Sequence, residues 1–129
     1  MIFVPTKFSG AWLLQPELRS DERGAFARAW CYDEFAAHGV NVRFVQGNIS
    51  INRKQGTVRG MHFQLGQHVE AKLVRCTRGS IFDVIIDLRP DSPTRCQWQG
   101  FELTADNHHS LFVPEGFAHG FQTLTDDTE

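Results

Sequence analysis

The sequence predicts an all-β fold, a sandwich or barrel with one short helix. Three observations lead to this prediction. Short segments of strand character recur roughly every 8–12 residues, with turn residues between them. No long helical pattern is present. Glycine and phenylalanine each occur 11 times, and several of the glycines fall at expected turns.

The expected elements can be given in chain order. Residues 33–38 are the one helix candidate, and Gly39 follows as a typical residue just past a helix end. Alternating parity predicts a strand over residues 42–51. Further strands are expected at residues 57–64, 71–77, 80–88, 98–104, 110–113 and 121–124. Turns are expected at residues 78–80, 89–93 and 114–116, where glycine and proline interrupt the strands.

Length, charge and hydropathy exclude several classes of protein. A chain of 129 residues is expected to form one domain with a real core. Its net charge is -2 with scattered lysines and arginines, so no nucleic-acid-binding surface is expected. No apolar run approaches the ~20 residues of a membrane helix, and the first residues lack a secretory signal pattern. Cys31, Cys76 and Cys96 form no metal or redox spacing, so they are expected to be small core residues in a reduced, cytoplasmic setting.

Two basic side chains are candidates for chemistry. Gly60, His62 and Gln64 share one face of a predicted strand. The imidazole of His62 can take and return a proton near neutral pH, although a lone histidine is more often satisfied by a neighbour or by solvent. Lys72 begins an apolar strand, where an ammonium at a cavity wall could stabilise an oxyanion. The alternative for Lys72 is a charged head that reaches water at a strand edge.

Polar residues at two other places extend this list. His119 follows the expected turn at residues 114–116, which would place an imidazole at the mouth of a strand. Gln46, Asn48 and Ser50 share one parity. They would line a wet ligand cavity if they faced inward, but alternation alone slightly favours a solvent face.

Three charged residues need partners. Arg23 lies in a polar segment that is either a solvated turn or a contact for a phosphate group. Asp83 and Asp87 share a face of an apolar strand, so each carboxylate needs a partner. For Asp87 a structural pair with Arg89 is expected. The partner of Asp83, either a histidine that it orients or an arginine, is left open.

Several segments are together more specific than any of them alone. They are DERGAF at residues 21–26, FVQGNIS at 44–50, GTVRGMHFQ at 56–64, AKLVR at 71–75, FDVIIDLR at 82–89, SPT at 92–94 and PEGFAHGF at 114–121. In these segments the sequence resembles the dTDP-4-dehydrorhamnose 3,5-epimerase family, and the resemblance extends over nearly the whole chain in the family's order and spacing. Its members are sugar-nucleotide epimerases of deoxysugar biosynthesis.

The resemblance implies a cupin-type jelly-roll β-barrel around a ligand cavity. It implies a homodimer without a metal or organic cofactor, acting on a dTDP-linked 4-keto-6-deoxyhexose. Removal of a proton beside the ketone and its return on the opposite face would invert C3, C5 or both. By this resemblance His62 is the general base, and Lys72 donates to the enolate oxygen. Substrate contacts are expected from Arg23, Phe26, Gln46, Asn48, Arg59 and His119, with Arg23 at the pyrophosphate and Phe26 beside it.

The sequence departs from the family pattern in two respects, and the positions of Arg59 and His62 raise a separate question of strand geometry. The family's proton-returning tyrosine and base-orienting aspartate lie after the stretch that matches residues 123–129. Residues 1–129 are therefore expected to be a single epimerase domain that lacks the family's C-terminal segment, and the activity of these residues alone is left open. Arg28 stands where some members carry an acidic residue, which bears on the nucleotide contact. Arg59 and His62 would face opposite ways in a regular strand, so a bulge, or an Arg59 that reaches round an edge, is required.

Two other functions are compatible with a cupin-like barrel. A metal-dependent cupin, such as a dioxygenase, could use His62, Gln64, Glu70 and His119, although Gln64 replaces the second histidine of the usual His-x-His pair. A sugar-nucleotide-binding barrel without catalysis would explain the lack of a proton donor. The presence of both His62 and Lys72 favours the epimerase.

Overall fold

Strands make up most of the regular backbone, as the sequence predicts. The structure is a computed structural model that describes residues 1–129. Its elements are β1 (Ile2–Pro5), β2 (Trp12–Gln15), β3 (Arg19–Asp21), β4 (Gly24–Phe26), α1 (Tyr32–Ala37), β5 (Val58–His62), the 3₁₀ turn η1 (Gly66–His68), β6 (Lys72–Arg75), β7 (Ser80–Asp87), β8 (Trp98–Thr104), β9 (Ser110–Val113) and β10 (Phe117–Thr123).

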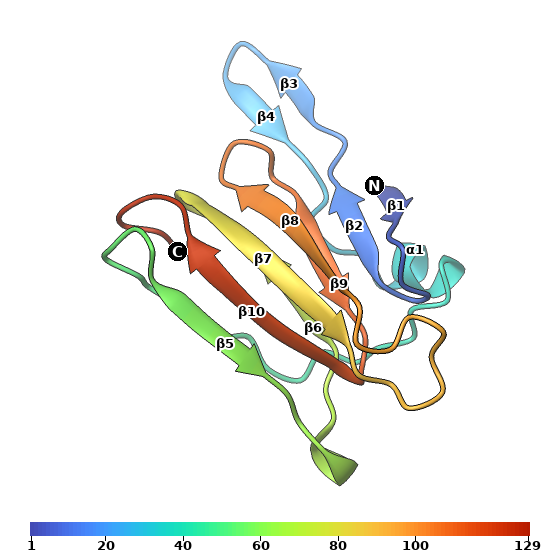
Figure 1. Cartoon of the computed structure of the whole chain (residues 1–129). Coiled ribbons are helices and arrows are strands. Elements are labelled where there is room, and N and C mark those ends of the chain that lie inside the picture. The colour runs from blue at the N-terminus through green and yellow to red at the C-terminus, as the bar shows by residue number, and fades with distance from the viewer.

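These strands form two four-stranded sheets and a separate hairpin. One sheet has the order β1-β2-β9-β6, the other has the order β5-β10-β7-β8, and β3 pairs only with β4. In Figure 1 the hairpin of β3 and β4 projects beyond one end of the sheets. The strand β5 forms an outer edge of its sheet, so one side of its backbone has no partner strand in the chain.

Alternation along β7 places the core between the two sheets. Ile81, Asp83, Ile85 and Asp87 are buried, and the residues between them are more exposed. Buried apolar side chains from both sheets form the main cluster, among them Ile81, Ile85, Leu103, Leu111, Val113 and Phe117. Burial of each such side chain contributes roughly 1.5–3 kcal/mol. This cluster therefore holds the sheets together and encloses two carboxylates.

The predicted helix is present, and it begins and ends one residue earlier than expected. It ends at Ala37, and Gly39 has a φ of +77°, a left-handed conformation that stops a helix at low cost. Phe35 is the buried residue of α1, and it packs in a second cluster with Leu14 and Phe112. No helix of the structure has the length and apolar character needed to cross a membrane.

Residues 42–51 require a correction, because they do not form the predicted strand. No backbone–backbone hydrogen bond involves any of them. The alternation in the sequence is still visible, since Val45 and Ile49 are exposed whereas Phe44 packs against the second cluster. A strand satisfies its backbone through a neighbouring strand, and the chain places none beside this segment.

Other expectations are wrong in detail. The strands β1 to β4 are not expected from the sequence, because each has only three or four residues. The strand β10 begins at Phe117, earlier than the expected residue 121, because its ladder with β7 runs from Phe117 to Thr123. Cys76 is buried as expected, but Cys96 is exposed in a turn with a φ of +63°.

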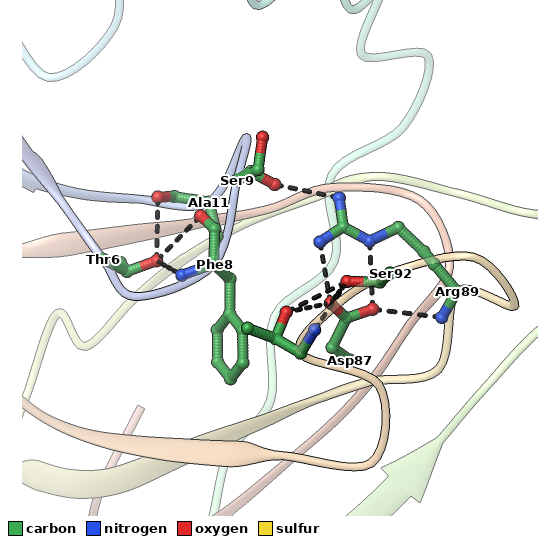
Figure 2. A network of polar contacts seen from close by, with 8 residues as sticks. Thr6, Phe8, Ser9, Ala11, Asp87, Arg89 and Ser92 are labelled. Carbon is green, nitrogen blue, oxygen red and sulfur yellow. Dashed lines mark hydrogen bonds and ion pairs between the residues drawn. The ribbon is translucent and has the colours of Figure 1, made fainter.

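A polar network joins the loop after β7 to the loop between β1 and β2 (Figure 2). The carboxylate of Asp87 accepts hydrogen bonds from Nε and Nη2 of Arg89 at 3.0 and 2.8 Å, and from the hydroxyls of Ser92 and Thr94. Arg89 Nη1 donates to the carbonyl of Ser9 at 2.9 Å. Burial alone would raise the pKa of Asp87, but these hydrogen bonds outweigh it and hold the pKa well below its usual range. The expected pair of Asp87 and Arg89 is confirmed.

Candidate functional site

A large hollow in the fold is lined by the predicted polar stripe. A cavity of about 550 Å³ lies between residues 44–52 and β6, with Phe121 of β10 also in its wall. Gln46, Asn48 and Ser50 all line this open cavity, and all three are exposed, so the stripe borders a cavity that is open to solvent. Lys72 lines the same cavity from β6. An open cavity with amide, hydroxyl and ammonium groups in its wall suits a polar ligand.

His62 and Lys72 meet at a second, smaller hollow. Both line a recess of about 10 Å³, together with Gln64 and Glu70. That volume is enough for about one water molecule. Glu70 and Lys72 line the recess and also the large cavity, so the two hollows are neighbours. Lys72 thus borders both the recess that contains His62 and the cavity that contains the polar stripe.

Glu70 holds Lys72 in the free protein. The Lys72 ammonium donates to Glu70 Oε1, and both side chains are only partly exposed. The hydrogen bond from Lys72 holds the pKa of Glu70 below its usual range. The sequence indicated Glu70 only as a possible metal ligand. Glu70 lies two residues before Lys72, and in a strand this spacing places both side chains on the same face. The spacing alone does not predict that the two side chains form an ion pair.

The bulge that Arg59 and His62 require is present in β5. His62 pairs with His119 and Arg59 pairs with Phe121, so three steps along β5 match two steps along β10. Gly60 lies at this irregularity with a φ of +105°. A Cβ on Gly60 would lie 2.7 Å from backbone atoms of β10, which explains why glycine fits there.

Arg59 reaches the rim of the large cavity through Asn52. Its Nε donates to Asn52 Oδ1 at 2.6 Å. Asn52 is 3% exposed, lines the cavity and pairs with Thr128 near the end of the chain. The sequence analysis did not identify Asn52, since nothing in its local pattern distinguishes it from a loop asparagine.

His119 is buried beside Asp83, which settles the partner that the sequence left open. His119 Nε2 lies 2.8 Å from Asp83 Oδ2. Burial raises the pKa of Asp83, and the hydrogen bond with His119 opposes this shift. His119 is not among the residues that line either hollow, but it lies opposite His62 in the ladder.

Arg23 and Phe26 lie elsewhere. Both belong to the hairpin of β3 and β4, and Arg23 pairs with Asp21 at 2.6 Å. Phe26 is 74% exposed and lines a cavity of about 270 Å³ with Arg28, away from the residues around His62. Within one chain the structure does not bring the hairpin together with the large cavity.

The metal-binding alternative does not fit these contacts. No group of three or more His, Cys, Asp or Glu side chains is placed to hold a metal ion. Glu70 is engaged by Lys72, and Gln64 supplies an amide where the usual pattern has a second histidine. The four residues that this alternative needs therefore do not form a set of ligands.

Comparison with known proteins decides the family. The family model described as dTDP-4-dehydrorhamnose 3,5-epimerase matches residues 5–129. The chain belongs to this epimerase family. A dTDP-4-dehydrorhamnose 3,5-epimerase from Salmonella typhimurium is 44% identical over 130 residues, which cover 100% of this chain and 70% of the relative.

Solved structures of the epimerase family share the fold. The dTDP-4-dehydrorhamnose 3,5-epimerase from Bacillus anthracis, with TDP and PPi bound, superposes with a TM-score of 0.95 at 46% identity, covering 98% of this chain and 73% of that one. An epimerase from Legionella pneumophila in complex with dTDP-4-keto-L-rhamnose has a TM-score of 0.90 at 35% identity, covering 98% and 67%. The expected cupin-like jelly roll is thereby confirmed.

The match to the epimerase family leaves part of the relatives uncovered. The chain spans 70% of the Salmonella relative and 66% of a relative from Methanothermobacter thermautotrophicus, to which it is 45% identical over 97% of its own length.

Proposed function

We propose that this protein is an isomerase that epimerises a dTDP-linked 4-keto-6-deoxyhexose at C3, C5 or both. The observation that carries the proposal is the recess shared by His62 and Lys72. The family assignment and the dTDP-sugar bound to a similar structure support the substrate class.

The chemistry follows from these two side chains. A hydrogen on the carbon beside a ketone is acidic only because the resulting carbanion spreads onto the carbonyl oxygen. A neutral imidazole at His62 removes this proton. The ammonium of Lys72 stabilises the negative charge on the enolate oxygen, an interaction that strengthens as the charge develops. Gln46 and Asn48 offer hydrogen bonds to the sugar hydroxyls or the diphosphate from the cavity wall.

Inversion requires that a proton returns on the opposite face of the sugar ring. His62 and His119 lie side by side on one sheet, so His119 does not offer a donor from the other side. In the family this donor is a tyrosine after the stretch that matches residues 123–129, followed by the aspartate that orients the base. We propose that residues 1–129 form one epimerase domain in which proton removal and enolate stabilisation are located.

A second copy of the chain completes the site in this proposal. Arg23 and Phe26 are expected to contact the nucleotide, but their hairpin lies away from the cavity of its own chain. The segment 42–51 also exposes Val45 and Ile49, and it makes no backbone–backbone hydrogen bond. Unpaired backbone beside exposed apolar side chains favours pairing with another chain. We therefore propose a homodimer in which the hairpin of one copy reaches the cavity of the other.

The three cysteines are free, which supports a reducing compartment, and we propose the cytoplasm.

Solvent exchange tests the proposed reaction. The protein, with its chain continued through the region in which relatives carry the tyrosine and aspartate, is incubated in D₂O with dTDP-4-keto-6-deoxyglucose. Deuterium at C3 or C5 of the sugar, detected by NMR or mass spectrometry, is the expected result. Tight binding of dTDP without exchange of this or a related keto-sugar would contradict the proposal and favour a non-catalytic binding barrel.

A further inference from the structure

Asp83 is a buried carboxylate in the middle of β7 to which the proposed reaction gives no role. It is 0% exposed and lies on the same face as Ile81 and Ile85. Its Oδ2 contacts His119, whereas its Oδ1 has no hydrogen-bond partner. An unpaired buried polar atom costs roughly 1–3 kcal/mol. Stability does not explain this carboxylate, because an aliphatic side chain there would avoid that cost.

His119 has one anchored ring nitrogen and one free ring nitrogen. Nε2 is held by Asp83, and Nδ1 makes no hydrogen bond within the chain. The buried side-chain nitrogen and oxygen atoms without a partner are Asp83 Oδ1 and Trp12 Nε1 only, so Nδ1 of His119 is not sealed in the core. This nitrogen remains available to a ligand.

The position of His119 on β10 places it beside both hollows. Phe117, His119 and Phe121 alternate onto one face of β10, since the ladder with β7 is regular. Phe117 lines the recess that contains His62, and Phe121 lines the large cavity. His119 also lies directly opposite His62, and side chains in such pairs start about 4.5–5.5 Å apart. The free nitrogen of His119 is therefore next to the candidate base.

We propose that Asp83 is a positioning residue that fixes the tautomer and the orientation of His119. An ionised carboxylate can only accept a hydrogen bond, so in that form Asp83 selects the imidazole tautomer that carries hydrogen on Nε2. Nδ1 is then a lone-pair acceptor in the neutral ring and a donor in the charged ring, at a fixed place beside the substrate. The consequence for turnover rests on the proposed epimerase function, whereas the tautomer itself does not.

The chain offers a matched control for this role. Asp83 and Asp87 are both 0% exposed on the same face of β7, but Asp87 pairs with Arg89 instead of a histidine. The test compares Asp83→Asn with Asp87→Asn. Nitrogen-15 NMR of the imidazole rings reports which nitrogen of His119 carries hydrogen, and steady-state kinetics report kcat and KM.

The two variants are expected to differ in the tautomer of His119 and in kcat. The protein and Asp87→Asn keep hydrogen on Nε2 of His119. Asp83→Asn shifts His119 toward the Nδ1–H form, because an amide can donate to Nε2. Its kcat falls about 10- to 100-fold with little change in KM, since the free nitrogen is misplaced while binding contacts remain.

Three results would overturn the proposal. They are an unchanged tautomer in Asp83→Asn, a changed tautomer with unchanged kcat, and hydrogen on Nδ1 of His119 in the neutral ring of the unaltered protein. The last measurement also decides the matter if Asp83→Asn does not fold. Failure of the proposed epimerase function has a different signature, namely no solvent exchange by the unaltered protein, and the tautomer comparison still decides the positioning role.

Discussion

Arg59 and His62 lie on one face of their sheet although they are three positions apart in β5. Their partners on β10, Phe121 and His119, are two positions apart and therefore share a face. Cross-strand partners point the same way, so β5 contains one additional residue between them. This bulge turns toward one face two residues that a regular strand would place on opposite faces.

Gly60 of β5 and Gly120 of β10 lie close together at the bulge, where neither has room for a Cβ. We therefore predict that Gly120→Ala destabilises the fold. A Cβ on Gly120 would lie 2.7 Å from both the carbonyl oxygen of Arg59 and the sulfur of Met61. We expect a loss of about 1–3 kcal/mol in the free energy of unfolding, measured with urea, because β5 must move away. Gly47→Ala is the control, since no atom lies within 4 Å of its Cβ and its φ is ordinary. Equal stability of the two variants would contradict this explanation.

Local sequence pattern predicted some elements to the residue and could not predict others. The strands β8 and β9 have the expected bounds, since proline, glycine and polar turns delimit them. Residues 42–51 have an equally clear alternation but no strand, because pairing depends on a neighbour that local pattern does not report.

The candidate site likewise depends on contacts between strands that local sequence pattern does not report. The sequence indicated His62 and Lys72 by residue type and resemblance, and the structure places both at one recess. The sequence could not indicate that Asp83 contacts His119, which is 36 positions away, because this contact depends on how β7 and β10 pair. Phe26 was indicated by resemblance alone and Arg23 also as a possible phosphate contact, and their exposed hairpin lies away from the cavity of its own chain.

Lys72→Met is predicted to lower kcat about 100- to 1,000-fold, as expected when a charged donor to an oxyanion is removed. The volume of the side chain is retained, so the affinity for dTDP is expected to change little. Glu70→Gln is the control, because it also removes the ion pair of Lys72 but keeps the ammonium. It is expected to change kcat less than about fivefold, since partly exposed ion pairs are weak. Similar losses in both variants would mean that the pair, rather than the ammonium, matters.

Asp87→Asn is predicted to destabilise the fold by about 3 kcal/mol near neutral pH, because it leaves Arg89 without its buried partner. The folded-state pKa of Asp87 is lowered, so its contribution is present above the unfolded value of about 4 and is lost as pH falls toward the lower folded value. Urea unfolding between about pH 7 and pH 2 should therefore show a weaker acid dependence in the variant. The exposed neighbour provides the control Asp91→Asn, and an identical pH profile for Asp87→Asn and Asp91→Asn would refute this role.

The proposed exchange of hairpins predicts that two inactive variants rescue each other. Arg23→Ala lacks the hairpin contact, and His62→Asn lacks the base. In mixed dimers with one copy of each, one site carries both changes and the other carries neither. Mixing equal amounts should restore activity to about a quarter of the unaltered level, because half of the dimers are mixed and half of their sites are intact. No recovery after subunit exchange would show that each chain uses its own hairpin.

The central claim is that His62 removes the proton while Lys72 stabilises the enolate at the same recess. The most direct test is the rate of deuterium entry from D₂O into the keto-sugar, measured for the unaltered protein and for His62→Asn at matched dTDP affinity. The account predicts that this substitution lowers the exchange rate at least about 100-fold, the contribution of a positioned general base. Exchange at an undiminished rate in His62→Asn would contradict it.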